Sequence, residues 1–201
     1  MEEKKERTIE KAREYFHRYW YRKASLSELI TEIGISKPTF YNYFKNKEEL
    51  FNAVMLATYN EFLYEYNQRA KNARSAMEKL DLYVRTYAWF LDTYPLFRDL
   101  YSPGNDLMPR WLKSRHSKDL YAEAVETLRA ILEEGRDEGL IRTDLDSGHA
   151  ALVLCQAITV GLSFDPNIFA RKDQPRYRVD VDTLLSVLGE GLVAPDQRSA
   201  E

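Results

Sequence analysis

The stretch GISKPTFYNYFKNKEEL at residues 34–50 decides the fold class of this chain. Gly34 readily adopts the positive φ at which helices often end. Ser36 is a favourable N-cap for a new helix, and Pro38 falls in the first turn of that helix, where a missing N–H costs nothing. The stretch therefore predicts a helix end, a tight turn and a second short helix.

Helical signals continue on both sides of this turn. Apolar residues recur at three- and four-residue spacing over residues 6–22, and Ser25 is the expected N-cap of a two-turn helix before the turn. After the turn, Phe40 and Phe44 share one helix face, and Asn46 caps a long further helix. Two short helices joined by a tight turn and packed on longer ones make a helix-turn-helix unit.

The remainder of the chain also predicts helices. Apolar stripes run over residues 80–91, 112–138, 146–162 and 179–192. Breaks are expected at Pro103-Gly104 and in a polar loop that contains Pro166 and Pro175. We expect two domains, residues 1–50 and residues 51–201, with the helix after Asn46 running stiffly from one into the other.

Composition excludes several classes of protein. Hydrophobic residues make up 44% of the 201 residues and charged residues 30%, which is typical of a soluble globular protein. The single cysteine, Cys155, cannot form an intrachain disulfide, and no apolar run approaches the length of a membrane span. We therefore expect a cytoplasmic protein with no membrane partner. His17, His116 and His149 lack metal-binding companions, so neither a metal nor another cofactor is expected.

Charge is distributed unevenly along the chain. Residues 1–50 hold 11 Lys and Arg against 9 Asp and Glu, whereas residues 51–201 hold 18 against 23. A basic N-terminal segment and an acidic remainder suit a chain whose N-terminal segment meets a polyanion.

The helix-turn-helix region resembles the N-terminal domain of the TetR family of bacterial transcriptional regulators. The resemblance is carried by SLSELI at residues 25–30 and, most specifically, by residues 34–50. It implies an all-α fold in which a three-helix DNA-binding domain is joined by a long helix to a larger helical domain for ligand binding and dimerisation. It also implies a repressor that leaves a palindromic operator in double-stranded DNA when a small, largely apolar effector binds.

A helix in the major groove can read base edges, and the resemblance names the side chains that do so here. The positions that it places at DNA are Ser27, Lys37, Pro38, Thr39, Tyr41, Tyr43 and Lys47. The outward position of Asn42 adds one more. The competing interpretations are core packing for Tyr41 and ordinary solvated surface for the two lysines.

An aromatic-rich segment suggests where an effector binds. The expected ligand residues are the aromatic side chains Tyr83, Tyr87, Phe90, Tyr94, Tyr101 and Trp111 and the polar side chains His116, Gln156 and Thr159. A plain aromatic core explains the same residues equally well, and the sequence does not separate the two interpretations.

The last two apolar stripes contain small residues that permit close helix packing. We expect them to form a four-helix interface between two copies, as in TetR-like proteins. The expected interface residues are Ala150, Leu154, Ala157, Ile158, Gly161, Val181, Leu184, Leu185, Leu188 and Leu192. The alternative is that they belong to the core of one chain.

The alternative function is an architectural or nucleoid-associated DNA-binding protein whose second domain recruits a protein partner. An enzyme is not expected, because the chain lacks GxSxG, HExxH and glycine-rich phosphate loops, and Cys155 has no neighbouring histidine in sequence.

Overall fold

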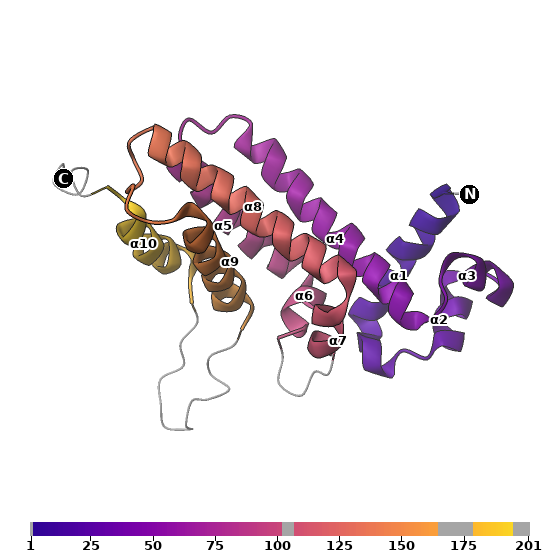
Figure 1. Ribbon diagram of the computed structural model, residues 1–201. Coiled ribbons are helices and arrows are strands. Elements are labelled where there is room, and N and C mark those ends of the chain that lie inside the picture. Colours follow the sequence, from indigo (N-terminus) through magenta and orange to yellow (C-terminus); the bar gives the residue numbers. More distant parts are fainter. Residues whose placement is uncertain (1, 102–106, 165–178, 195–201) are drawn as a thin grey trace, which may run out of the picture.

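The computed structural model describes residues 2–101, 107–164 and 179–194, which fold as packed helices (Figure 1). The expected breaks at Pro103-Gly104, Pro166 and Pro175 lie outside the described residues. An isolated antiparallel bridge between Ile141 and Val193 is the only β pairing within the described part of the chain. None of the described helices is long and apolar enough to cross a membrane.

The helix-turn-helix unit forms as the sequence predicts, from α1 (Glu2–Lys23), α2 (Leu26–Ile33) and α3 (Lys37–Tyr43). The hydroxyl of Ser25 accepts a hydrogen bond from the N–H of Glu28 at 3.4 Å and caps α2. The hydroxyl of Ser36 accepts from the N–H of Thr39 at 3.2 Å and caps α3. Gly34 ends α2 at a φ of 78°, the left-handed conformation that favours glycine.

A long helix, α4 (Lys47–Ala70), leads from this unit into the rest of the molecule (Figure 1). Asn46 begins α4 by accepting a hydrogen bond from the N–H of Glu49 at 2.8 Å. The helices that follow are α5 (Ala76–Thr93), α6 (Pro95–Asp99), α7 (Leu107–Lys113), α8 (Arg115–Asp137), α9 (Ser147–Ser163) and α10 (Val181–Leu192).

The single helix expected over residues 112–138 is wrong. α7 ends at Lys113, and the hydroxyl of Ser114 accepts a hydrogen bond from the N–H of Ser117 at 3.0 Å, which starts α8. The chain therefore turns at Ser114, between α7 and the long helix α8.

Aromatic side chains fill the core between α4 and α5. Phe62 is fully buried, and its ring centroid lies 5.3 Å from that of Tyr83 and 5.6 Å from those of Tyr87 and Phe90. Phe40 and Phe44 form the core of the helix-turn-helix unit, with ring centroids 5.7 Å apart, as their four-residue spacing predicts. Aromatic packing therefore supports both the helix-turn-helix unit and the larger helical region.

One glycine is required by close packing between distant parts of the chain. A Cβ on Gly135 would lie 2.5 Å from Cδ1 of Ile141 and 3.0 Å from the Cβ of Ala76. We expect Gly135→Ala to lower the free energy of unfolding by about 1–3 kcal/mol, measured by urea denaturation, because a packed core cannot absorb an added methyl group. In α10, Gly191→Ala is the control, because a Cβ there meets nothing within 4 Å. Equal unfolding free energies for the two variants would contradict this account.

Candidate nucleic-acid interface and ligand cavity

The recognition face of α3 projects into solvent. Tyr41 is 56% exposed, and Lys37, Pro38 and Asn42 are exposed beside it. Phe40 lies on the opposite face of α3 and is completely buried, which fixes the rotation of this short helix about its axis. The core interpretation of Tyr41 is therefore wrong, and four candidate DNA residues share one accessible face.

The remaining hydroxyl-bearing candidates border this face. Ser27 is exposed in the first turn of α2. Tyr43 is half-buried, and the hydroxyl of Thr39 lies 2.8 Å from that of Ser36, so it is engaged in the cap of α3. Hydroxyls in such places are suited to phosphate oxygens, since they require no charge and are held by the helix.

Lys47 is placed differently from the other candidates. Its ammonium donates to the carbonyl oxygens of Tyr21 and Ala24, each at 2.8 Å, and lies 4.1 Å from the centre of the Tyr21 ring. Partial burial, and secondarily the charge of Arg110, lower the pKa of the Lys47 ammonium. Lys47 therefore uses two of its three N–H groups inside the chain, where it joins the end of α1 to the start of α4.

A stability measurement tests this internal role. We expect Lys47→Met to lower the free energy of unfolding by about 1–3 kcal/mol, because two carbonyl groups lose their donor. The control is Lys45→Met, since Lys45 is exposed and its ammonium has no hydrogen-bond partner among the described residues. Urea denaturation measures both variants, and an unchanged free energy for Lys47→Met would contradict the internal role.

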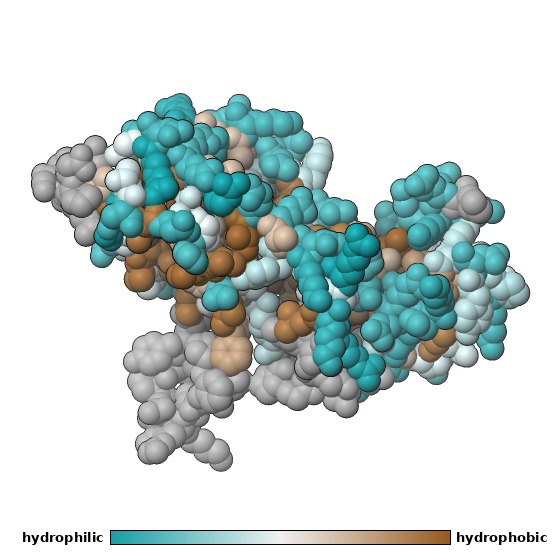
Figure 2. Space-filling view, viewed as in Figure 1, coloured by the Kyte–Doolittle hydropathy of each residue, from teal (hydrophilic) through white to brown (hydrophobic). Residues whose placement is uncertain are grey.

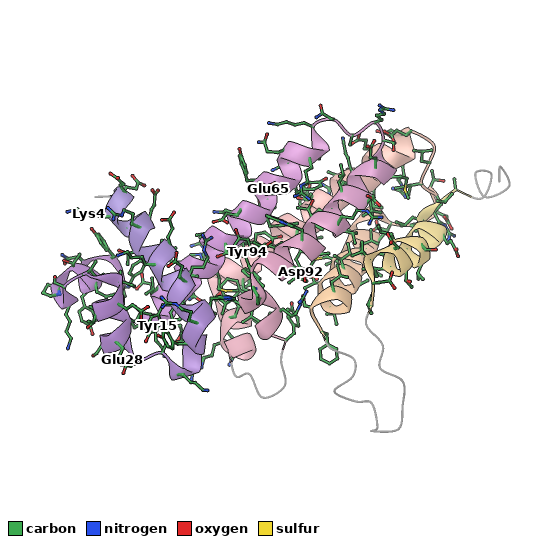
Figure 3. All side chains as sticks on the ribbon, turned by 180° about the vertical axis from the view of Figure 1, so that it is seen from behind. Lys4, Tyr15, Glu28, Glu65, Asp92 and Tyr94 are labelled. Atoms are coloured by element: carbon green, nitrogen blue, oxygen red, sulfur yellow. The ribbon has the colours of Figure 1, made fainter. Side chains whose placement is uncertain are left out.

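The sequence interpretation missed a basic face on α1. Lys4, Arg7 and Lys11 border a hollow of about 190 Å³, together with Thr39 and Tyr43 of α3. Lys11 donates to the carbonyl of Ile33 at 2.8 Å, whereas Lys4 and Arg7 form no ion pair with any described residue. Figure 3 shows Lys4 towards the free end of α1. The spacing of three and four residues was the available signal, because it puts all three cations on one helix face.

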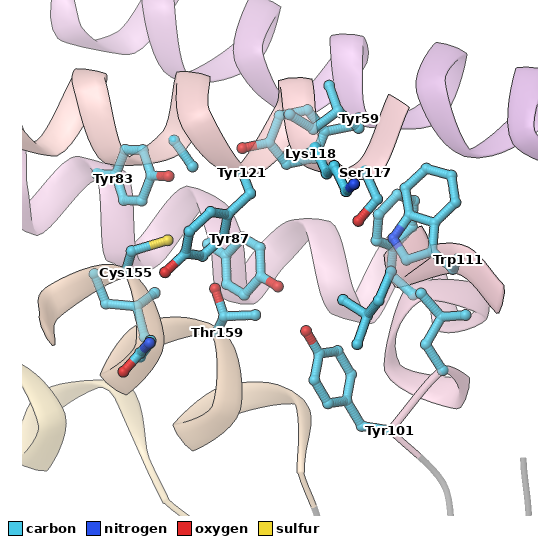
Figure 4. A pocket seen from close by; sticks show the side chains of 17 residues that line it. Tyr59, Tyr83, Tyr87, Tyr101, Trp111, Ser117, Lys118, Tyr121, Cys155 and Thr159 are labelled. Atoms are coloured by element: carbon cyan, nitrogen blue, oxygen red, sulfur yellow. The ribbon is translucent and has the colours of Figure 1, made fainter. Parts of the chain in front are cut away.

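The larger helical region contains a cavity of about 440 Å³ (Figure 4). It is enclosed by α4 to α9, and its lining is largely apolar and aromatic. The lining residues are Tyr59, Tyr83, Tyr87, Phe97, Leu100, Tyr101, Trp111, Leu112, Ser117, Lys118, Leu120, Tyr121, Ala124, Cys155, Gln156, Ile158 and Thr159.

Six of the nine expected ligand residues line this cavity, namely Tyr83, Tyr87, Tyr101, Trp111, Gln156 and Thr159. The other three do not. Phe90 is completely buried between Phe62 and Phe97, and His116 is exposed outside the cavity lining. Tyr94 lies where α1 meets the larger region (Figure 3), and its hydroxyl donates to Glu61, which also pairs with Arg13 of α1.

Burial keeps the tyrosine hydroxyls of the cavity uncharged. Desolvation raises the pKa of Tyr59, Tyr83, Tyr87 and Tyr101 above the ordinary value. The hydroxyl of Tyr87 lies 3.4 Å from that of Ser163. The deep wall of the cavity thus offers neutral polar groups in an aromatic setting. Tyr59 escaped the sequence interpretation because it belongs to α4, far from the aromatic-rich segment.

The expected interface residues divide into two groups. Leu154, Ile158 and Leu192 are at most 5% exposed in the single chain, so their assignment to a surface between copies is corrected to the core. The half-buried group comprises Ala150, Ala157, Gly161, Val181, Leu184, Leu185 and Leu188. The most exposed apolar side chains of these two helices are instead Leu152, Val153, Val160 and Val187. Figure 2 shows hydrophobic residues gathered over α9 and α10.

Within the described residues, no group of three or more His, Cys, Asp or Glu side chains is arranged to hold a metal ion. The described surface and cavity therefore owe their chemistry to hydroxyls, aromatic rings and a few cations.

Residues 9–54 match the family model described as bacterial regulatory proteins, tetR family. The chain is also 32% identical over 121 residues to the HTH-type transcriptional repressor NicS of Pseudomonas putida. That match spans 57% of this chain and 54% of the repressor, about half its length.

Solved structures of regulators share the whole fold. FadR of Bacillus subtilis, solved in complex with stearoyl-CoA, has a TM-score of 0.68 at 21% identity over 94% of this chain and 97% of FadR. A putative transcriptional regulator of Saccharomonospora viridis, solved in complex with choline, has a TM-score of 0.69 at 17% identity over 96% of this chain and 100% of that protein. At these identities the likeness concerns the fold. Together with the match at residues 9–54, it shows an all-α fold that carries the helix-turn-helix region of bacterial regulatory proteins of the tetR family.

Proposed function

We propose that this protein is a sequence-specific, DNA-binding transcriptional repressor that acts in the bacterial cytoplasm. The observation that carries the proposal is the exposed face of α3, where Lys37, Pro38, Tyr41 and Asn42 project from a short helix fixed by two caps and a buried phenylalanine. A helix presented in this way fits the major groove of B-DNA.

Phosphate contacts are assigned to the residues around this face. Ser27, Thr39 and Tyr43 offer hydroxyls, and Lys4 and Arg7 of α1 add positive charge beside the last two. Such contacts fix the register of the protein on DNA, while α3 reads the bases. Lys47 supports the unit from inside, through its carbonyl contacts, and leaves at most one N–H for DNA.

The protein acts as a homodimer of two-domain chains, with residues 1–50 binding DNA and residues 51–201 binding effector and partner copy. The exposed apolar side chains Leu152, Val153 and Val160 of α9 and Val187 of α10 support an interface on these helices, with the half-buried residues at its margin. Two recognition helices about 34–36 Å apart reach successive major grooves, which calls for a palindromic operator.

A small molecule in the 440 Å³ cavity releases the operator. Relatives of the same fold hold ligands as different as stearoyl-CoA and choline, so the fold accommodates diverse effectors. A direct contact leads from the cavity towards DNA, because Trp111 of the cavity wall packs on Phe51 of α4 with ring centroids 6.5 Å apart. Phe51 in turn packs on Phe16 and Tyr21 of α1, at 5.7 and 4.9 Å. Movement of the cavity wall thus reaches the DNA-binding unit through packed rings.

Selection of binding sites from random double-stranded DNA with the purified protein tests the proposal. We expect a palindromic consensus whose half-sites are separated by about one helical turn. Recovery of no consensus above background would overturn sequence-specific repression and favour an architectural DNA-binding protein. The operator obtained also serves as the probe for the variants considered below.

A further inference from the structure

The polar groups of the cavity differ between its two ends. Figure 4 shows Tyr83 and Cys155 at one end and Trp111, Ser117 and Lys118 at the other. Burial raises the pKa of the Tyr83 hydroxyl and of the Cys155 thiol, so the first end is neutral. The other end, at the junction of α7 and α8, holds Lys118, the charged group of the described lining.

Each polar side chain at the α7–α8 end can donate a hydrogen bond. Ser117 and Trp111 are each 8% exposed, and neither the hydroxyl nor the indole N–H has a partner among the described residues. Figure 4 shows the indole nitrogen of Trp111 on the side facing Ser117. Indole N–H donates only, and the Lys118 ammonium has three N–H groups. Because these donors border the cavity, a ligand that supplies acceptors is favoured here.

The same end is electrostatically positive. Among the described residues that line the cavity there is no Asp or Glu, and Lys118 is the one charged residue. Lys118 is exposed and forms no ion pair with a described residue. Its α8 neighbours three and four residues away, Arg115, Tyr121 and Ala122, carry no negative charge. The N-terminal end of the 23-residue helix α8 adds the positive pole of its dipole.

Aromatic rings form the rest of the enclosure. Tyr87, Tyr101, Trp111 and Tyr121 present rings to the cavity, and the aliphatic side chains between them carry no charge. Such walls favour a flat, apolar body that stacks against rings or meets their edges. The cavity volume lies at the lower end of the usual range for small-molecule sites, about 300–1,000 Å³, which favours a small ring system.

We propose that the cavity binds the anion of an aromatic carboxylic acid, with the ring system among the tyrosines and the carboxylate at the α7–α8 end beside Ser117 and Lys118. The proposal rests on the proposed function in one respect, that this cavity is the effector site. It adds the chemical class and the orientation of the ligand. A cationic ligand is disfavoured, because the described residues of the cavity lining include one ammonium and no carboxylate.

Three probes that share one ring system but differ in charge test the proposal. Calorimetric titration of the full chain at pH 7.5 compares 2-naphthoate, 2-naphthalenemethanol and 2-naphthylmethylammonium. We expect 2-naphthoate to bind at least about tenfold more tightly than the alcohol, because a charge-assisted hydrogen bond exceeds a neutral one, and the ammonium probe to bind most weakly. Equal affinities for the anion and the alcohol, tightest binding of the ammonium probe, or no binding of 2-naphthoate would each overturn the proposal.

Variants locate the carboxylate. Lys118→Gln is expected to weaken 2-naphthoate binding about tenfold while changing alcohol binding less than about twofold, because only the anion uses the charge. Ser117→Ala is expected to weaken 2-naphthoate binding as well. Lys113→Gln is the matched control, because Lys113 is an exposed lysine near the end of α7 that does not line the cavity. Equal effects of Lys118→Gln and Lys113→Gln would overturn the orientation.

Operator binding separates this proposal from the proposed function. If 2-naphthoate binds as expected but leaves operator affinity unchanged, the ligand class stands and effector-controlled repression fails. If the protein selects a palindrome but prefers the neutral or cationic probe, repression stands and the ligand class fails.

Discussion

The double variant Lys37→Ala, Tyr41→Ala is expected to bind its operator at least about a hundredfold more weakly than the wild-type protein. Both side chains project from the exposed face of α3, and Tyr41 is 56% exposed with no role in the core. Each good contact to a base edge contributes about 1–3 kcal/mol of discrimination, and each 1.4 kcal/mol is about tenfold in affinity. Fluorescence anisotropy with the selected operator measures the loss.

The matched control removes the same two residue types at the far end of α4. Lys71 is exposed where α4 ends, and Tyr64 is 62% exposed on the same helix. Lys71→Ala, Tyr64→Ala is expected to leave operator affinity within about twofold, since effects on DNA fall off beyond a Debye length of about 8–10 Å. A Lys37→Ala, Tyr41→Ala variant that is folded and binds operator like this control would contradict the assignment of the recognition face.

Phe62→Ala is expected to have the largest effect on stability, lowering the free energy of unfolding by about 3–5 kcal/mol. Phe62 is fully buried on α4, and its ring contacts those of Tyr59, Tyr83, Tyr87 and Phe90 within 5.6 Å. Truncation leaves a hole beneath rings that cannot collapse onto it, because three of them also wall the ligand cavity. Urea denaturation followed by circular dichroism measures the change.

Tyr64→Ala is the control for this loss as well, because Tyr64 lies two residues away on α4 but faces solvent. We expect it to change the free energy of unfolding by less than about 0.5 kcal/mol. A Phe62→Ala variant within 1 kcal/mol of the wild type, about the loss of one buried methylene, would show that the aromatic cluster is not the main support of the larger region.

The helix-turn-helix unit could be predicted from the sequence because its determinants are local. The side chains of Ser25, Ser36 and Asn46 each accept a hydrogen bond from the N–H three residues ahead. Gly34 ends α2 because it adopts a positive φ. The outward face of α3 could be predicted because Phe40 and Phe44 are four residues apart and both face the core, which leaves the opposite face to solvent. The break at Ser114 also depends on a local contact, the cap from Ser114 to the N–H of Ser117. It was not predicted, because apolar residues recur at helical spacing on both sides of Ser114.

The contacts of Lys47 could not be predicted from its neighbours in the sequence. Its partners Tyr21 and Ala24 lie 26 and 23 residues away, and only the folding of α1 against α4 brings them to the ammonium. The basic face of α1 likewise becomes part of the candidate DNA surface only through its proximity to Thr39 and Tyr43.

The caps, the helical class, the exposed face of α3 and six of the seventeen described cavity-lining residues could be predicted from the sequence. Tertiary structure decided that Phe90 is core while Phe97 lines the cavity, and that Leu154 faces inward while Val153 faces outward. For Leu154 and Val153 the cause is that α9 is apolar around much of its circumference, and Phe97 lies on α6, a helix too short to show a period. Periodicity selects a buried face only when the opposite face is polar, so on these helices the packing of neighbours makes the choice.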